Sequence, residues 1–372
     1  MKMVELFSGC GGLAKGMENS GFSHVALVEF NHQACESLRC NFNADIVHET
    51  DVRDFDFTPY LGVDAIAGGP PCQPFSLGGL AKAYEDSRDM FPQAIRAISE
   101  LLPKGFVFEN VKGLLRKSFS EYFNYIVLRL TYPTFEKKDG ESWQSHLARL
   151  QKLVFPIYHE LKYHVYYKLL NAADYGVPQI RERVFIVGIR EDIPHEWHWP
   201  KPQFNKTDWL SLQSALNGIP DPRSPKNSIP DHKFIDGARI YPGHTGSSLN
   251  EPCKTIKAGA HGVPGGENMI RNADGSVRYL TIHEAKLIQT FPPEYTITGS
   301  WGEAMRQIGN AVPVRLAECI GKQLFETISS QKGKNSNYKV DETGNLMLFE
   351  KHARYHAKSG KGIKQSARMA KH

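Results

Sequence analysis

The chain has 372 residues, of which 41% are hydrophobic and 23% are charged. This length accommodates one large domain or two moderate ones, and the composition excludes a disordered or fibrous protein. No apolar run approaches membrane-spanning length, and the N-terminus lacks the apolar core of a signal peptide. The six cysteines form no Cys-x-x-Cys pair, which favours free thiols in a reducing cytoplasm.

The net charge of +5 is unevenly placed along the chain. The last stretch, 331–372, contains ten Lys and Arg but only three Asp and Glu, so the rest of the chain is close to neutral. A basic tail is typical of proteins that bind a polyanion such as nucleic acid. It is equally typical of a solvated extension, and the charge alone does not separate these two interpretations.

The chain opens with the pattern of a nucleotide-type site. Met3 to Phe7 is predicted as a buried strand, and a turn containing Gly9, Gly11 and Gly12 leads into a predicted helix that begins at Leu13. Glycines in such a turn let backbone N–H groups approach a ligand without obstruction. Glycine-rich turns between strands and helices are also common without any ligand.

Acidic residues follow the next two predicted strands. Glu29 ends the strand Val25 to Val28, at the distance from the glycine turn where an acid commonly binds ribose hydroxyls. Its neighbour Phe30 suits packing on an adenine ring or capping of the sheet. Asp51 and Val52 come near a further strand end, where a carboxylate suits an adenine amino group. The chain has no Gly-Lys-Ser/Thr phosphate loop. A cofactor with an adenosine but no pyrophosphate therefore fits best, namely S-adenosylmethionine.

A cysteine stands in a stiff loop after the strand Val63 to Ala67. Two glycines and two prolines, 68–71, precede Cys72, and the prolines fix the backbone and remove donors. The cysteine is thus held at the carboxyl end of a core strand, where open α/β sheets bind ligands. It is predicted either as a thiolate nucleophile or as a small buried hydrophobe in a proline-rich turn.

Further candidate catalytic residues follow two later strands. The apolar strand Phe106 to Phe108 ends in Glu109, which we expect at the same sheet edge as Cys72. Apolar surroundings raise the pKa of a carboxyl group, and a carboxyl group with a raised pKa suits the role of a proton donor. Its alternative role is a helix cap with the adjacent asparagine. Arg181 and Arg183 alternate in the segment between two strands predicted as a pair, Tyr163 to Leu170 and Val184 to Ile189. Both side chains would point to the same side of an extended segment, which suits a clamp on a base or phosphate, although paired arginines are usually only solvated.

Taken in order, these motifs resemble the DNA (cytosine-5)-methyltransferase family. The matching residues are 7–12, Glu29, Asp51, Pro70-Pro71-Cys72-Gln73, Glu109-Asn110-Val111, Gln179-Ile180-Arg181-Glu182-Arg183, Arg278-Tyr279-Leu280-Thr281, Gln289-Thr290-Phe291-Pro292 and Gly309-Asn310-Ala311-Val312-Pro313. Each fragment alone is ambiguous, whereas their joint occurrence in the family's order is specific. One departure is that His283 and Lys286 stand where the family more often has arginines.

The resemblance implies an α/β fold, a doubly wound, Rossmann-like sheet of an S-adenosylmethionine-dependent methyltransferase with a smaller, loop-rich target-recognition domain. We expect a catalytic domain over 1–190, the target-recognition domain over 191–300, a helix returning to the catalytic domain over 301–330, and a basic tail over 331–372. Within the second domain, 241–246 and 257–266 are candidate DNA-facing loops.

The resemblance also assigns roles to residues. Cys72 would attack carbon 6 of a flipped-out cytosine, Glu109 would act at ring N3, and Arg183 with Arg181 would hold the ring oxygen and the thiolate region. The expected S-adenosylmethionine pocket comprises Phe7, Gly9, Gly11, Gly12, Glu29, Phe30, Asp51, Val52, Asn310 and Val312. No metal is expected. We further expect a monomeric bacterial cytoplasmic enzyme that acts on double-stranded DNA and is paired with a restriction endonuclease.

Two other classes of function compete with this one. An RNA cytosine-5 methyltransferase of the two-cysteine type needs a second catalytic cysteine where this chain has Glu109, and the tRNA-modifying branch of the DNA family usually carries a Cys-Phe-Thr motif that is absent here. A cofactor-fold protein that only binds DNA is disfavoured by the intact set of Cys72, Glu109, Arg181 and Arg183. The target sequence itself cannot be read from the chain.

Overall fold

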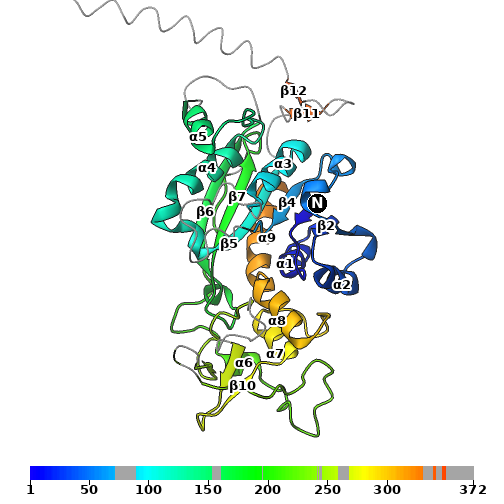
Figure 1. The fold of residues 1–372 in the computed structure, drawn as a ribbon, viewed down its shortest axis with the longest axis vertical. Helices are drawn as coiled ribbons and strands as arrows, with labels where there is room; N and C mark the ends of the chain where they lie inside the picture. Colours follow the sequence, from blue (N-terminus) through cyan, green and yellow to red (C-terminus); the bar gives the residue numbers. More distant parts are fainter. Residues whose placement is uncertain are drawn as a thin grey trace, which may run out of the picture.

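A mixed sheet of seven strands forms the centre of the molecule (Figure 1). The computed structural model describes residues 1–71, 89–152, 161–194, 196–240, 242, 245–258 and 268–329, and the backbone of 338–340 and 346–348. The strand order is β3-β2-β1-β4-β5-β7-β6. The strands are β1 (Lys2–Leu6), β2 (Ser23–Glu29), β3 (Val47–Glu49), β4 (Ala65–Gly68), β5 (Gly105–Val111), β6 (Tyr163–Asn171) and β7 (Glu182–Arg190).

The first five strands are parallel, while β7 runs antiparallel to both of its neighbours. This confirms the predicted strand pair near the end of the first half of the chain, which forms the edge β7-β6. After β3 the chain returns to the centre and places β4 on the other side of β1. The order of strands therefore reverses between β1 and β4, and ligands bind at such a switch point in open α/β sheets.

Helices cover both faces of the sheet, as the doubly wound prediction requires. Successive residues of a strand face opposite sides, so Met3 and Val107 pack under α1 and α9 while Val4 and Phe106 pack under α3, α4 and α5. These helices and α2 are α1 (Gly12–Asn19), α2 (His32–Asn41), α3 (Phe91–Leu101), α4 (Ser120–Thr131), α5 (Trp143–Lys152) and α9 (Val314–Ser329). Among the residues with described structure, no helix is long and apolar enough to cross a membrane.

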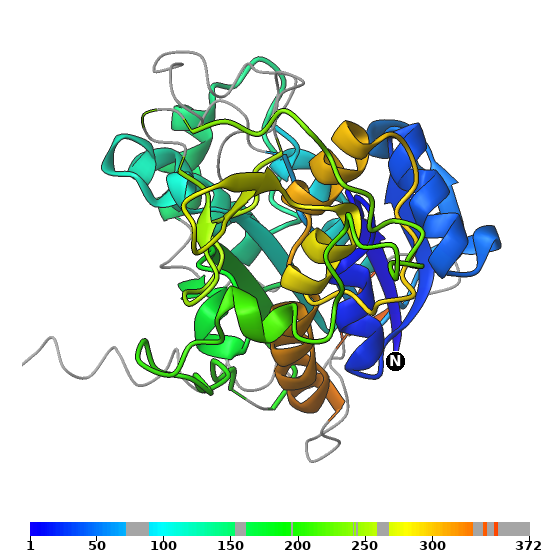
Figure 2. The same cartoon turned by 90° about the horizontal axis from the view of Figure 1, so that it is seen from below.

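A smaller part of the molecule, with little regular structure, lies beyond one end of the sheet; Figure 2 looks onto it from below. It contains a three-stranded sheet and short helices: β8 (Ser247–Ser248), β9 (Met269–Arg271), β10 (Val277–Tyr279), α6 (Leu212–Ala215), α7 (Ile282–Ile288) and α8 (Trp301–Asn310). Sequence reasoning expected one helix over 301–330 and did not separate α8 from α9; α8 shares one apolar core with α7. Two further short strands, β11 (Tyr338–Val340) and β12 (Leu346–Leu348), pair with each other.

The two ends of the described core meet where α1 packs against α9 (Figure 1). Gly16 makes this close approach possible, because a Cβ at that position would lie 2.4 Å from the Cβ of Ala317 and 2.6 Å from the carbonyl oxygen of Val314. Helix α9 begins directly after the segment that contains Asn310 and Val312. The contact at Gly16 therefore holds residues from the end of the core beside the glycine turn at its beginning.

We predict that Gly16→Ala destabilises the protein relative to the matched variant Gly302→Ala. Both changes replace a helical glycine, but a Cβ at Gly302 meets no atom within 4 Å, whereas one at Gly16 meets backbone. Overpacking of this kind costs about 1–3 kcal/mol. Urea denaturation of the two variants measures the difference in the free energy of unfolding, and equal stabilities would contradict the proposed close approach.

Candidate active site

A cavity of about 660 Å³ opens at the carboxyl ends of the parallel strands, at the switch point of the sheet. Its volume falls within the range of about 300–1,000 Å³ that is usual for small-molecule sites. Nine of the ten residues predicted for the cofactor line it: Phe7, Gly9, Gly12, Glu29, Phe30, Asp51, Val52, Asn310 and Val312. The catalytic candidate Glu109 lines the same cavity.

Glu29 joins the turn after β1 to the end of β2. Its Oε2 accepts a hydrogen bond of 2.8 Å from the N–H of Gly9, and its Oε1 accepts one of 2.7 Å from the N–H of Asn31. A Cβ at Gly9 would meet no atom within 4 Å, so this glycine borders open space. Gly9 and Phe7 both have positive φ, of 54° and 55°, and a non-glycine residue in that conformation is a sign of a strained, functional turn.

The two other glycines of the turn serve packing. Gly11 has a φ of 87°, and a Cβ on it would lie 2.4 Å from Oη of Tyr295. Gly11 does not line the cavity, so its predicted contact with a cofactor remains a prediction. A Cβ on Gly12 would lie 2.4 Å from the carbonyl oxygen of Val312. The glycine there lets the returning segment form a wall of the cavity.

Asp51 and Phe30, which also line the cavity, have the chemical character that an adenosine site needs. Asp51 accepts hydrogen bonds from the backbone N–H and from Nε of Arg53, both at 2.9 Å, and these bonds with the guanidinium lower the pKa of the Asp51 carboxyl. Phe30 is 74% exposed, a large apolar ring at the rim with one face open to a planar partner. A carboxylate kept ionised beside an open aromatic ring suits an amino-purine.

Glu109 is the buried acid of the cavity. It is 8% exposed, and Nε of Arg183 lies 2.8 Å from its Oε1. Among the described residues, Oε1 pairs with the Arg183 guanidinium and has no other polar partner. Burial raises the pKa of Glu109, and the charges of Arg183 and Arg181 oppose this rise. A buried carboxyl group whose pKa is raised therefore lines the cavity.

The strand that leads to the predicted nucleophile is tied to the strand that carries Glu109. Nδ2 of Asn110 donates to the carbonyl oxygen of Pro70 at 3.0 Å, and the N–H of Met90 donates to that of Pro71 at 3.1 Å. Cys72 itself lies outside the described residues. Asn110, which follows Glu109 in the sequence, was predicted as part of a family motif or of a helix cap. Its contact with Pro70 holds the segment that enters the cysteine loop at Glu109's end of the sheet.

Arg181 is placed differently from the other predicted catalytic residues. It is 1% exposed, and its guanidinium donates to the carbonyl oxygens of Ile256, Gly309 and Ala311 at 3.0, 2.7 and 2.9 Å. Its charge still acts on Glu109, because it opposes the rise of that pKa. A direct clamp on a bound base by Arg181 remains a prediction, whereas its bonds to three carbonyl groups are a structural fact.

Cys10 lines the cavity, but its environment is unlike that of a nucleophile. Cys10 is 1% exposed, and burial raises the pKa of its thiol to about 12. The thiols of Cys35 and Cys253 likewise have pKa values raised to about 12, chiefly by burial. A thiolate is the reactive form of cysteine, so these three residues are poor candidates for nucleophilic catalysis.

The cavity also contains residues that sequence reasoning missed. Arg306 and Gln307 line it from α8. Arg306 is paired with Glu303 through Nε at 2.8 Å and Nη2 at 2.6 Å, while Gln307 accepts a hydrogen bond of 2.7 Å from Ser37. Arg306 and Gln307 come directly before the Gly309–Pro313 motif in the sequence. This position indicates a place in the cavity only once residues 301–310 are known to form a helix.

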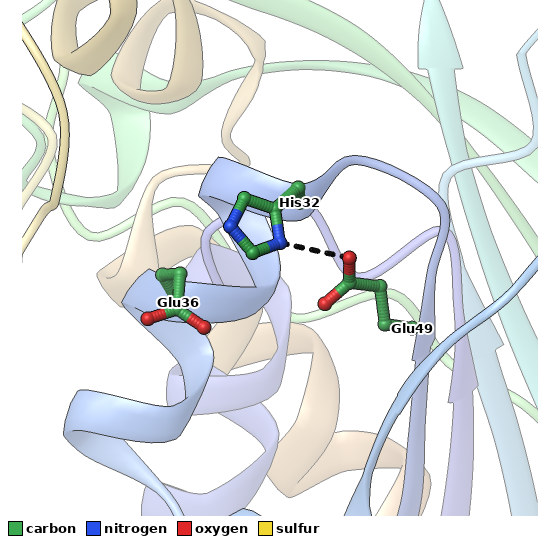
Figure 3. A group of neighbouring side chains, drawn as sticks. All are labelled: His32, Glu36 and Glu49. Atoms are coloured by element: carbon green, nitrogen blue, oxygen red, sulfur yellow. Dashed lines mark hydrogen bonds and ion pairs between the residues drawn. The ribbon is translucent and has the colours of Figure 1, made fainter.

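A cluster of His32, Glu36 and Glu49 lies outside the cavity, between the start of α2 and the end of β3 (Figure 3). Nδ1 of His32 lies 2.8 Å from Oε1 of Glu49. Arg39 forms ion pairs with Glu36 at 2.7 Å and Glu49 at 2.9 Å, so both carboxylates already have a cationic partner. The cluster is an ion-pair network on the surface.

Comparison with known proteins identifies the family. The family model for C-5 cytosine-specific DNA methylases matches residues 1–133 and 151–326. The chain is 33% identical over 340 residues to the Type II methyltransferase M.NgoMIV of Neisseria gonorrhoeae, covering 88% of this chain and 98% of that protein. It is also 32% identical to M.Eco47II of Escherichia coli, over 88% of this chain and 79% of that one. The chain belongs to the C-5 cytosine-specific DNA methylase family and is a DNA (cytosine-5)-methyltransferase.

Solved structures agree with the fold. A putative DNA modification methyltransferase encoded within an Escherichia coli prophage superposes with a TM-score of 0.62, at 21% identity, over 89% of this chain and all of that one. The Dnmt2 methyltransferase of Schizosaccharomyces pombe superposes with a TM-score of 0.63, at 15% identity, over the same shares. These comparisons confirm the α/β methyltransferase fold. The family uses S-adenosylmethionine as its methyl donor, as the sequence analysis predicted.

The raised pKa of Glu109 predicts a pH-dependent effect of Glu109→Gln on stability. Ionising Glu109 costs more in the folded than in the unfolded protein, so its contribution to the free energy of unfolding falls as the pH rises above the ordinary value of 4.5. The variant lacks this loss. We therefore expect the stability of Glu109→Gln relative to the unmodified protein to increase with pH, measured by urea denaturation between pH 4.5 and 8.

The control for this experiment is Glu141→Gln. Hydrogen bonds from Arg149 lower the pKa of Glu141 to about 2 in the folded protein. Above its ordinary pKa of 4.5 this carboxyl is therefore ionised in both the folded and the unfolded protein, and its stabilising effect is lost only at lower pH. Its relative stability should be level from pH 5 to 8. A level profile for Glu109→Gln as well would show that burial does not perturb Glu109.

Proposed function

We propose that this methyltransferase modifies carbon 5 of a flipped-out cytosine within a specific duplex sequence and thereby protects the DNA from a cognate restriction endonuclease. The observation that carries this proposal is the meeting of Glu109, the segment leading to Cys72, and the rim formed by Gly9 and Glu29 at one cavity. Relatives named Type II methyltransferases support the restriction–modification role.

The proposed chemistry begins with activation of the ring, because carbon 5 of cytosine is a poor nucleophile. The Cys72 thiolate forms a bond to carbon 6, and the π electrons of the carbon 5–carbon 6 bond move to form a carbon 4–carbon 5 double bond. The π electrons of the carbon 4–N3 bond pass to N3, which receives the proton of Glu109. The raised pKa of Glu109 suits this donation. Arg183, 2.8 Å from Glu109, then stabilises the carboxylate that remains.

When bound, S-adenosylmethionine supplies the methyl group that the activated carbon 5 accepts. Glu29 and Asp51 present carboxylate oxygens to the ribose hydroxyls and the adenine amino group, and Phe30 packs on the purine. Asn310 and Val312 complete the wall opposite Gly12. Loss of the carbon 5 proton to water then restores the carbon 5–carbon 6 double bond and expels the Cys72 thiolate, and the N3 proton returns to the Glu109 carboxylate.

Target recognition is assigned to the smaller part of the molecule. Carbons 5 and 6 are inaccessible within a stacked duplex, so the base must leave the helix, as in other enzymes that modify bases. We propose that residues 191–300 read base edges with a few placed side chains, as expected of the target-recognition domain. Most of the two candidate loops, 241–246 and 257–266, lies outside the described residues.

Expression from a plasmid followed by bisulfite sequencing tests the proposal. We expect protected cytosines in one recurring sequence context, which also identifies the target. The matched variant Cys72→Ser should leave every cytosine unprotected, while Cys35→Ser, which changes a thiol outside the cavity, should retain the pattern. Absence of protected cytosines with the unmodified enzyme would overturn DNA methylation by this chain.

Trapping tests the role of Cys72 itself. Duplex DNA with 5-fluorocytosine at the target position cannot lose its carbon 5 substituent as a proton, so the covalent adduct should accumulate. We expect this adduct with the unmodified enzyme and S-adenosylmethionine, and none with Cys72→Ser, in a denaturing gel and by mass spectrometry. An adduct that persists in the variant would remove Cys72 as the nucleophile.

We predict that Glu29→Gln weakens binding of S-adenosylmethionine at least tenfold. An amide has one oxygen, so it cannot accept from the N–H groups of both Gly9 and Asn31, and a hydrogen bond to a charged group contributes about 1.5–3 kcal/mol. Isothermal titration calorimetry measures the affinity. Glu36→Gln is the control, an acid of the same region that lies outside the cavity, and equal affinities for both variants would contradict the role of Glu29.

A further inference from the structure

The segment that precedes β7 lies alongside a segment of the smaller part. The N–H of Ile180 donates to the carbonyl oxygen of Cys253, and the N–H of Cys253 donates to that of Pro178, both at 2.9 Å. Oγ1 of Thr255 donates to the carbonyl oxygen of Ile180 at 2.7 Å. These bonds join the catalytic sheet to residues 253–256 through the backbone.

Arg181 extends this junction to the wall of the cofactor cavity. Nη1 donates to the carbonyl oxygen of Ile256, while Nη2 donates to those of Gly309 and Ala311, which flank the cavity residue Asn310. All of these groups are in the interior, where a lost hydrogen bond is not replaced by water. A displacement of Ile256 relative to Gly309 and Ala311 therefore breaks hydrogen bonds to the Arg181 guanidinium.

Gln179 and Gln289 provide a second connection between the same segments. Oε1 of Gln179 accepts from the N–H of Ile256 at 3.1 Å, and its Nε2 donates to Oε1 of Gln289 at 3.2 Å. Nε2 of Gln289 in turn donates to the carbonyl oxygen of Ile308 at 2.7 Å, in the last turn of α8. Both glutamines are fully buried, so this chain of amides is as constrained as the arginine beside it.

The end of helix α8 also contacts residues 257 and 258 directly. A Cβ at Gly309 would lie 2.5 Å from the backbone nitrogen of Ala258 and 2.6 Å from the carbonyl carbon of Lys257. Asn268 holds that backbone from the other side, since its Oδ1 accepts from the N–H of Lys257 and its Nδ2 donates to the carbonyl oxygen, both at 3.1 Å. The position of residues 257 and 258 thus follows the position of Gly309.

We propose that Arg181, together with the Gly309 contact, is a positioning device that couples the cofactor cavity to the part of the protein that reads DNA. A cofactor that contacts Asn310 and Val312 also fixes Gly309 and Ala311, because these residues are their neighbours in the chain. Arg181 bonds to both of them and to Ile256, so the position of Ile256 depends on theirs. Binding of cofactor then favours the arrangement of residues 253–258 that fits target DNA. This inference rests on the proposed role of residues 191–300 as the reader.

The coupling is measurable as a ratio of affinities. The probe is a duplex carrying the sequence context found by bisulfite sequencing, and its dissociation constant is measured with and without saturating S-adenosylhomocysteine. Coupling between sites in proteins is typically about 5- to 150-fold, and it is reciprocal. We expect a ratio in this range for the unmodified enzyme, and the same factor when S-adenosylhomocysteine binding is measured with and without DNA.

Gly309→Ala tests the contact, with Gly302→Ala as the matched control. Both replace a glycine of α8, but only the first inserts a Cβ into the backbone of Lys257 and Ala258. We expect the ratio to fall close to one in Gly309→Ala and to remain at its original value in Gly302→Ala. A purely structural defect would raise the dissociation constant for DNA equally with and without S-adenosylhomocysteine. An unchanged ratio in Gly309→Ala would therefore overturn the proposal.

Arg181→Lys provides an independent variant. A lysine keeps the charge but lacks the planar pair of nitrogens that bridges Ile256 to Gly309 and Ala311. We expect the ratio to fall here too, and either variant that folds, judged by thermal melting, is sufficient for the test. A ratio of one in the unmodified enzyme would also overturn the proposal. Failure of the proposed function is distinct, because the unmodified enzyme would then protect no cytosine.

Discussion

The reversal of strand order between β1 and β4 is the constraint on which the site depends. Parallel strands end at one edge of a sheet, and the reversal leaves a crevice there that no crossover helix fills. The turns after β1, β2, β3, β4 and the end of β5 all border the same cavity. Residues such as Gly9 and Glu109, which are 100 positions apart, therefore share one site.

Burial of charge gives this site its chemistry. A carboxylate transferred from water into a protein interior loses solvation, and Glu109 regains only part of it from Arg183 and Arg181. The result is an acid that holds its proton more tightly than an exposed one. The positive charges of the two arginines limit this rise in the pKa, because they lower the cost of ionising Glu109.

The two arginines of one short motif have separate positions. Arg183 lies on β7 beside Glu109, whereas Arg181 precedes the strand and bonds to carbonyl groups of the smaller part and of the segment around Asn310. Alternation along an extended segment predicted a shared task for both. The partners of the Arg181 guanidinium come from positions more than 70 residues later in the chain.

The sequence by itself determined the class of fold and most of the cavity. Strands alternate with helices, apolar residues repeat with matching periods, and the motifs follow the family's order. Nine of the ten residues that were predicted for the cofactor accordingly line one cavity. Local pattern was sufficient because each of these residues lies at a strand end or in the turn that follows it. The tertiary structure alone decided the packing role of Gly11, the tie between Asn110 and Pro70, the helix α8 and the bonds of Arg181. Those features depend on contacts between segments far apart in the chain, and no local pattern of residues encodes which distant carbonyl group a buried side chain will meet.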